Sequence, residues 1–226
     1  MSKKEPVSES PPGTVTRPDA ADLAVQWVTV HRRRLTIGAT FVFLIGGGFW
    51  FTRAAQIRKD DFAARSLSQA RFAAISGNLQ LAASDLTGII TTYGRTPAGQ
   101  EAVILLANVY LQQAQPQLAV AQLQQLLSVG TKPQFEGPAN DMLGKAFEEA
   151  GQYDDAAVAY AAAAAATPYD MLQADLWLDE ARAALAARDT ARAIAAYRSI
   201  IEEDDESVAA AEAVFRLAEL RTLQGG

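Results

Sequence analysis

The sequence predicts an all-α protein, in which one N-terminal transmembrane helix precedes an α-solenoid of about four helix pairs and a C-terminal capping helix. Three observations predict this fold class. Residues 35–52 form an uncharged, mostly apolar run of 18 residues. Small residues then recur every 37 positions along the rest of the 226-residue chain. Six consecutive alanines at 161–166 fit a tightly packed helix, because alanine has the highest helix propensity.

The residues before the uncharged run divide into two parts. Residues 1–18 are rich in Pro and Ser and have almost no large apolar side chain, which predicts a disordered tail. Residues 19–34 predict a short helix on the membrane surface, with Leu23, Trp27 and Val30 at helical spacing. The only histidine, His31, stands beside three arginines, and we interpret it as a polar anchor rather than a ligand.

Residues 35–52 predict a single transmembrane helix. As a helix the run is about 27 Å long, close to the roughly 30 Å of a bilayer's hydrocarbon core. Arginines flank both ends, and the aromatic residues 49–51 lie near one end, where such rings favour the interface. The glycines within the run allow close approach of a neighbouring membrane helix; they are Gly46, Gly47 and Gly48.

Two other interpretations of this run remain open, a buried core helix and a cleaved signal peptide. The run starts after 34 residues and exceeds the usual apolar length of a signal peptide. The sequence after it, TRAAQIRKDD, is charged and has no convincing cleavage site. We therefore expect an uncleaved anchor.

Charge is unevenly distributed along the chain. Residues 1–52 hold six Lys/Arg and four Asp/Glu, a net charge of +2, while the remainder holds 14 against 22, a net charge of −8. The short tail has three arginines directly at the membrane boundary, although the other side also carries five basic residues in its first turns. The charge rule for short loops places the tail on the inner side of the membrane and residues 53–226 on the outer side. A domain at −8 is a poor candidate for nucleic-acid binding.

Residues 53–226 contain a repeat of constant period. Four alanines are each 37 residues apart, and a bulky residue follows each of them four positions later. The alanines are Ala82, Ala119, Ala156 and Ala193, and the bulky residues are Leu86, Leu123, Tyr160 and Tyr197. A second small position gives Ala70, Ala107, Gly144, Ala181 and Ala218. Turn pairs occur at 77–78, 114–115, 151–152 and 188–189. A small residue where two helices cross lets their axes approach to about 8 Å.

The unit LGKAFEEAGQYDDAAVAYAAAAAATP, at 143–168, resembles the tetratricopeptide repeat. Leu143, Gly144, Phe147, Tyr160 and Pro168 match its pattern. The resemblance implies antiparallel helix pairs that stack and bind proteins along a concave groove. The period of this family is usually 34, and we expect the extra residues between repeats, in GRTPAG and SVGTKPQFEGP.

The ends of the array are less regular. The first repeat is the weakest match, and its first helix follows the predicted span with no Gly or Pro between Phe49 and Ser76. One helix is therefore expected to leave the membrane and become the first repeat helix. SVAAAEAVFRLAELRTL, at 207–223, is expected to cap the open end. The preceding acidic run, 202–206, is interpreted as a solvated turn, with a cation site as the alternative.

The residues point to binding rather than catalysis. Residues 53–226 have no His and no Cys, and there is no phosphate-binding loop or metal-ligand pattern. We expect no enzyme activity, no cofactor, no metal and no small-molecule substrate. The resemblance implies that first-helix residues just after the small position face a ligand. The predicted partner-binding residues are Arg71, Asn108, Leu111, Lys145 and Arg182; the alternative is that they are ordinary surface residues.

The order of the segments is similar to a narrower family, the single-span ancillary subunit of the bacterial SecYEG translocon. A surface helix, one span and a repeat array follow each other, and LANVYLQQAQPQLAVAQLQQLL lies at 106–127. The resemblance implies a single-pass inner-membrane protein with a cytoplasmic N-terminus and residues 53–226 in the periplasm. It also implies that the protein links the translocon to periplasmic chaperones through protein contacts. Two other functions remain open, a docking subunit or assembly factor of another inner-membrane complex and a cell-division or envelope coordinator.

Overall fold

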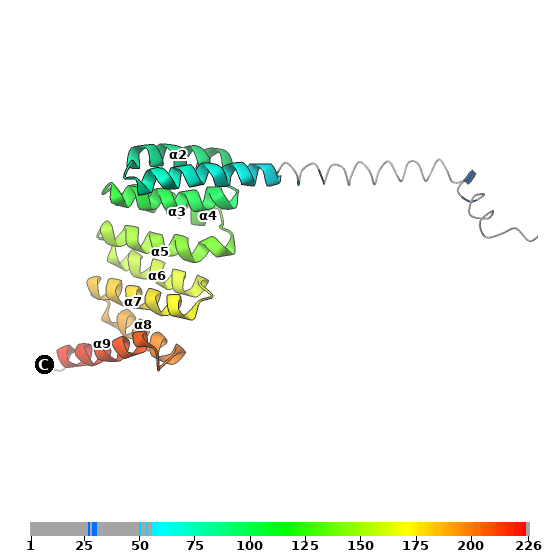
Figure 1. Ribbon diagram of the computed structural model, residues 1–226. Coiled ribbons are helices and arrows are strands. Elements are labelled where there is room, and N and C mark those ends of the chain that lie inside the picture. Colours follow the sequence, from blue (N-terminus) through cyan, green and yellow to red (C-terminus); the bar gives the residue numbers. More distant parts are fainter. Residues whose placement is uncertain (1–26, 28, 31–49, 51–52, 54–55, 225–226) are drawn as a thin grey trace, which may run out of the picture. The chain divides into compact units, whose positions relative to one another are not determined.

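The computed structural model describes residues 27, 29–30, 50, 53 and 56–224 (Figure 1). The chain divides into two compact units, Met1–Ala55 and Gln56–Gly226. The five described residues of the first unit all have helical backbone. Among the described residues, no helix is long and apolar enough to cross a membrane.

Most of the predicted N-terminal features lie outside the described residues. This applies to the tail 1–18, to residues 19–34 apart from residues 27, 29 and 30, and to the predicted span 35–52 apart from Trp50. The predicted membrane-contact residues Gly46, Gly47 and Gly48 also lie outside them. The predictions for these segments therefore stay predictions.

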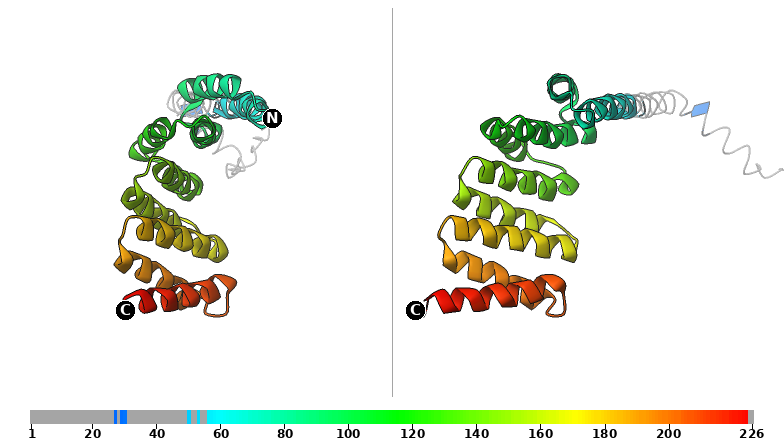
Figure 2. Two further views of the ribbon diagram at one scale, coloured as in Figure 1. Left: turned by 90° about the vertical axis from the view of Figure 1, so that its left-hand side faces the viewer. Right: turned by 60° about the vertical axis from the view of Figure 1, so that its left-hand side comes forward.

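The described part of the second unit is an all-α solenoid, as predicted. Residues 56–75 are helical, and eight further helices follow in residues 79–224. They are α2 (Leu79–Tyr93), α3 (Pro97–Gln112), α4 (Pro116–Ser128), α5 (Pro133–Glu149), α6 (Tyr153–Ala166), α7 (Asp170–Ala186), α8 (Thr190–Glu203) and α9 (Val208–Gln224). Each labelled helix contacts the next along the chain, and α3 also contacts α5 while α7 contacts α9. The helix pairs therefore stack in chain order (Figure 2).

The turn inside each pair has one left-handed residue, and these residues are 37 positions apart. The backbone φ is +79° at Gly77, +56° at Ala114, +74° at Gly151 and +65° at Arg188. In the third turn, Gly151 N–H donates to the carbonyl of Glu148 at 2.9 Å, and Gln152 N–H donates to that of Phe147 at 2.8 Å. This bond pair is the Schellman motif, which satisfies the last carbonyls of a helix. The four predicted turn pairs are confirmed.

The small residues of the repeat lie at helix crossings. Ala82, Ala119, Ala156 and Ala193 are all fully buried. At Gly144 an added Cβ would lie 2.6 Å from Tyr160 Cε1, so the tyrosine ring occupies the space that a side chain would need. The alanine run 161–166 forms the end of α6, which stops at Thr167. These alanines therefore belong to a packed helix and not to a linker.

The extra residues of the 37-residue period lie mainly inside helices, which corrects the expectation that they fall between repeats. In SVGTKPQFEGP only residues 129–132 separate two helices, because α5 begins at Pro133. Proline suits the first turn of a helix, where its missing N–H has no intrahelical partner. As a result α5 has 17 residues, against 14 in α6.

Within residues 56–224, the core consists of two apolar clusters that meet at α3. The first cluster includes Leu67, Leu86 and Leu106, and the second extends from Val103 and Ala107 as far as Ala213 in α9. Ala218 in α9 is the fifth residue of the series that begins with Ala70, and it is exposed. Its counterparts pack against the second helix of their own pair, and no such helix follows α9 within the described residues.

Candidate protein-interaction groove

A hollow of about 640 Å³ lies between α7 and α9. Its apolar lining consists of Leu178, Leu185, Tyr197 and Leu220. Its polar lining consists of Asp179 and Arg182 from α7, and Glu212, Arg216 and Glu219 from α9. Its volume lies within the range of pockets that bind ligands, and we call it the α7–α9 groove.

Arg182 joins the α7 wall of this groove to the preceding repeat. Its Nη2 donates to Asp179 Oδ1 at 2.6 Å, and its Nη1 donates to Glu148 Oε1 at 2.7 Å. Glu148 belongs to α5, and its other oxygen accepts a hydrogen bond from the Tyr160 hydroxyl of α6 at 2.7 Å. The guanidinium is therefore held by two carboxylates, and the network connects three helices.

Burial and the two carboxylates set the ionisation of this network. Burial of Tyr160, together with its hydrogen bond to Glu148, raises the pKa of the tyrosine hydroxyl, so this group stays a donor. Burial opposes the positive charge of Arg182, but Asp179 and Glu148 outweigh it and raise the pKa of the guanidinium. Arg182 therefore stays positively charged at neutral pH.

The α9 wall contains a second arginine between two carboxylates. Arg216 Nη1 lies 3.2 Å from Glu219 Oε2, and Arg216 Nε lies 3.6 Å from Glu212 Oε1. The hydrogen bond to Glu219 raises the pKa of Arg216. Its guanidinium carbon also lies 6.0 Å from the centre of the Phe215 ring, within the range of a cation–π contact.

The groove thus offers an apolar floor between two rows of paired charges. Both arginines already have carboxylate partners, so the groove is not built to capture a free carboxylate group. An apolar side chain of a partner would displace water from Leu178, Leu185 and Leu220, while partner backbone and polar groups would exchange hydrogen bonds with the rims. The arrangement suits a polypeptide better than a small charged metabolite.

The structure brings only one of the five predicted partner-binding residues, Arg182, into this groove. Arg71 forms an ion pair with Glu101 of α3. Asn108 accepts a hydrogen bond from Gln112 at 2.6 Å, and Lys145 pairs with Asp141 at 2.8 Å. Leu111 is partly buried and packs against the second apolar cluster. The three basic residues of this set are therefore paired with carboxylates within the chain, and partner binding by the five residues stays a prediction.

Sequence reasoning missed the α9 side of the groove. Glu212, Arg216, Glu219 and Leu220 were expected only to cap the array, yet they form one of its walls. A signal was present, because the 37-residue step from Ala181 reaches Ala218, inside α9, and makes Glu219 the equivalent of Arg182. The terminal helix therefore acts as the first helix of a fifth unit.

The described residues contain no group of three or more His, Cys, Asp or Glu side chains that could hold a metal ion. The acidic residues 202–206, for which a cation site was the alternative, are all exposed. Asp204 accepts a hydrogen bond from Glu206 N–H at 3.2 Å, and Ser207 Oγ accepts one from Ala210 N–H at 3.0 Å. Glu202 and Glu203 thus end α8, and residues 204–206 form the turn before α9.

Comparison with solved structures finds the same fold at low sequence identity. A tetratricopeptide repeat protein from Parabacteroides merdae ATCC 43184 is 16% identical, with a TM-score of 0.57 over 71% of this chain and 60% of that chain. MamA is 17% identical, with a TM-score of 0.54 over 69% of this chain and 86% of that chain. MamA from Desulfovibrio magneticus RS-1 is 17% identical, with a TM-score of 0.51 over 84% and 98%. These similarities show the fold alone.

No curated protein matches the chain. Family comparison, in contrast, covers nearly all of the repeat region. A tetratricopeptide repeat matches residues 178–225, and a tetratricopeptide repeat-like domain matches residues 55–176, which is more than half of the chain. The predicted repeat family is confirmed, and the chain is a repeat scaffold of the type that mediates protein–protein interactions. The chain therefore belongs to the tetratricopeptide repeat-like domain family.

Proposed function

We propose that this chain is a membrane-anchored scaffold of the bacterial inner membrane that holds partner polypeptides in the α7–α9 groove. The observation that carries the proposal is the groove itself, a hollow of about 640 Å³ with an apolar floor and paired charges on both walls. Its walls are first helices of successive units, the helices that line the binding groove in this family. Its partners are proteins, and the bilayer is contacted through one span.

The anchor is supported by the sequence. Residues 35–52 are uncharged, long enough to cross a bilayer and flanked by arginines. With the three-arginine boundary on the cytoplasmic side, the N-terminus is cytoplasmic and the repeat domain is periplasmic. Gly46, Gly47 and Gly48 then offer a surface on which a neighbouring membrane helix packs closely.

The narrower proposal is an ancillary subunit of the SecYEG translocon that links secretion to periplasmic chaperones. It is supported by the order of surface helix, span and repeat array, and by the sequence at 106–127. A chaperone or a chain emerging from a translocon would present apolar side chains to the groove floor. The groove chemistry is therefore compatible with such partners.

Co-purification of full-length protein from solubilised membranes tests the proposal. We expect the chain to stay in membranes after carbonate washing and to recover translocon or chaperone components. Arg216→Glu would place four carboxylates around the groove rim, and we expect it to reduce that recovery several-fold. Arg198→Glu, an equal charge change on an exposed residue of α8, is the matched control.

Three results would contradict parts of the proposal. Release of the chain by carbonate would refute the anchor. Recovery of a different membrane complex would refute the translocon role while leaving the scaffold in place. Equal recovery by Arg216→Glu and the control would show that partners bind elsewhere, and the glycines of the span would then be tested next.

A further inference from the structure

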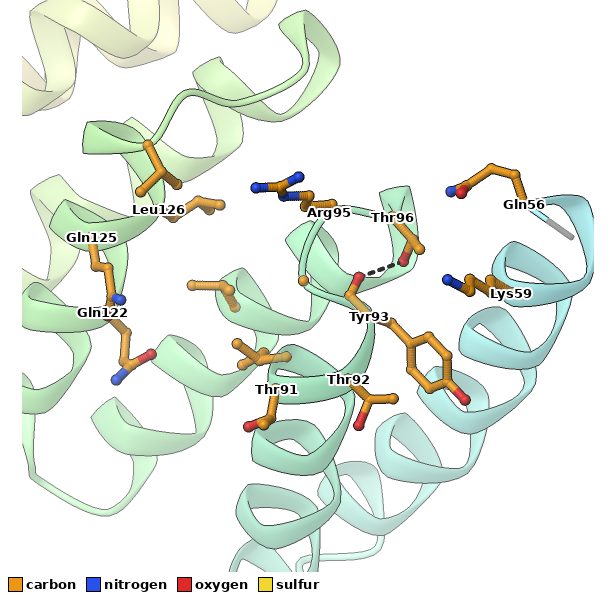
Figure 3. Close-up of a pocket in the computed structure, with 14 residues that line it drawn as sticks. Gln56, Lys59, Thr91, Thr92, Tyr93, Arg95, Thr96, Gln122, Gln125 and Leu126 are labelled. Atoms are coloured by element: carbon orange, nitrogen blue, oxygen red, sulfur yellow. Dashed lines mark hydrogen bonds between the residues drawn. The ribbon is translucent and has the colours of Figure 1, made fainter. Parts of the chain in front are cut away.

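A second hollow, of about 680 Å³, lies at the beginning of the array. Helix 56–75 contributes Gln56 and Lys59, and the link between α2 and α3 contributes Arg95. Figure 3 shows Gln56 and Lys59 on one side of the hollow, Gln122, Gln125 and Leu126 on the other, and Arg95 between them. The Thr96 hydroxyl donates to the carbonyl of Tyr93 at 2.8 Å and closes the link.

The cations of this hollow differ from those of the α7–α9 groove. Lys59 and Arg95 are exposed, and neither forms an ion pair with any of residues 56–224. Arg182 and Arg216, in contrast, are each held by two carboxylates. The Gln56 amide donates to Asp60 at 3.4 Å. The two cations without an ion-pair partner within residues 56–224, together with the amides of Gln122 and Gln125, present a surface that favours an anion.

Charge is also distributed unequally along the repeat array. Residues 56–132 hold six Lys/Arg and four Asp/Glu, a net charge of +2, whereas residues 133–224 hold seven against 18, a net charge of −11. The links between repeats lie on the same edge of the array as the hollow, and their charge also changes from basic to acidic along the chain. Arg95 and Lys132 lie in the links before α3 and α5, at the early end of this edge, and the acidic run 202–206 lies at its late end. Arg58 and Lys59 also belong to the early repeats and are followed by Asp60 and Asp61.

Exposed apolar side chains accompany the cations. Val129 lines the hollow and is 76% exposed, and Ile57, next to Gln56 in the chain, is 53% exposed. Apolar side chains beside Lys and Arg are typical of surfaces that bind at the boundary between lipid headgroups and acyl chains. A site for a small soluble anion has no need of these two side chains.

We propose that this edge of the first two repeats docks on the anionic phospholipid headgroups of the bilayer. Lys59 and Arg95 bind headgroup phosphates, while Val129 and Ile57 enter the interface. The proposal rests on the proposed function, because a span that ends at Thr52 leaves three residues before Gln56. Even in a fully extended chain, the Cα atoms of Thr52 and Gln56 are at most about 14 Å apart, so the headgroups are within reach of this edge.

Docking would orient the repeat array on the membrane. The acidic half, at −11, would be repelled by the same anionic surface, because like charges repel at short range. The α7–α9 groove lies in that half. The early repeats would thus lie on the membrane, and the partner groove would remain accessible.

Fluorescence quenching in vesicles tests this proposal on the full chain. The protein has no cysteine, so Ser128→Cys, next to Val129, gives a single labelling site. The labelled protein is mixed with vesicles of phosphatidylcholine, with or without phosphatidylglycerol, that carry a headgroup quencher. We expect stronger quenching in the anionic vesicles, decreasing at high salt. A probe at Val208→Cys, at the acidic end of the edge, is expected to show no such increase.

Charge reversal gives the matched comparison. One cation near an anionic surface contributes about fivefold to the binding constant. The double variant Lys59→Glu/Arg95→Glu should therefore weaken docking by at least about 25-fold and bring quenching to the level of neutral vesicles. The control Arg198→Glu/Arg221→Glu makes the same change in net charge on exposed residues of α8 and α9 and should leave quenching unchanged.

Flotation of the same samples separates failure of docking from failure of the anchor. Flotation with both vesicle types but equal quenching in both would retain the anchor and overturn docking. Flotation with anionic vesicles alone would support docking and overturn the anchor. Flotation with neither would overturn both. Loss of the extra quenching in anionic vesicles on adding soluble glycerol phosphate, but not on adding sodium chloride to the same ionic strength, would identify a small-anion site and overturn bilayer docking.

Discussion

Replacing Ala114 with glycine is expected to stabilise the repeat array. Ala114 adopts φ +56° in the turn between α3 and α4, a left-handed conformation that costs a residue with a Cβ about 1–2 kcal/mol. Glycine avoids this cost but has about 0.4–1 kcal/mol more conformational freedom to lose on folding. The expected net gain in the free energy of unfolding is about 0.5–1 kcal/mol.

The equivalent turn of another repeat has a glycine and therefore allows the reverse substitution. Gly151 has φ +74° at the equivalent turn, and an added Cβ would meet no atom within 4 Å. Gly151→Ala therefore adds left-handed strain without a steric clash, and we expect it to lower stability by about 0.5–1 kcal/mol. Ala162→Gly, at an exposed position inside α6, makes the same chemical change as Ala114→Gly but should destabilise by up to about 1 kcal/mol.

Thermal unfolding of the full chain, followed by far-ultraviolet circular dichroism, measures these effects. For an array of this size, 1 kcal/mol shifts Tm by about 2–4 °C. Ala114→Gly should raise Tm, and the other two variants should lower it. A fall in Tm with Ala114→Gly, equal to that with Ala162→Gly, would refute the assignment of left-handed strain to this turn.

Three further substitutions test the packing and the electrostatics of the array. Ala156→Leu should cost about 1–3 kcal/mol by overpacking a fully buried crossing, and an unchanged Tm would show that the crossing has room. Tyr160→Phe removes a donor from the Glu148 carboxylate and should cost about 1–3 kcal/mol in urea unfolding; no change would show that this hydrogen bond contributes nothing net. Burial raises the pKa of Glu180, partly opposed by Arg192, so the folded state disfavours the charged carboxylate. Glu180→Gln should therefore stabilise the fold at pH 7, and its advantage should vanish below about pH 4, where this carboxyl is protonated even in the unfolded chain; a gain of equal size at both pH values would contradict that sign.

The repeat could be predicted from sequence because its determinants are local and recur. Ala156 and Gly144 mark a helix crossing, and Gly151 marks a turn. The steric requirements of both recur every 37 residues, so a position that is ambiguous in one unit can be assigned from the equivalent positions in the others. The start of α5 was harder to place. Pro133 and Pro138 favour a link when the sequence is considered alone, but Pro133 fits the first helical turn and Pro138 lies inside the helix.

The candidate site was less predictable because it depends on side-chain pairing between helices. Arg182 contacts Glu148, 34 residues earlier, whereas the equivalent Arg71 contacts Glu101, 30 residues later. One repeat position therefore pairs in opposite directions in two units, and no periodic rule specifies the choice. The role of α9 as a groove wall likewise depends on its packing beside α7, which its sequence alone does not specify.

Site-specific photocrosslinking in membranes tests the groove as the partner-binding surface most directly. Glu212 lies on the groove rim, and its side chain is 49% exposed, so a photoreactive phenylalanine analogue at this position would contact a bound polypeptide. Val158 of α6 is 53% exposed and does not line the groove, which makes it the matched control. The account predicts adducts with translocon or chaperone components from position 212 and none from position 158. The same adducts from both positions, or from position 158 alone, would contradict it.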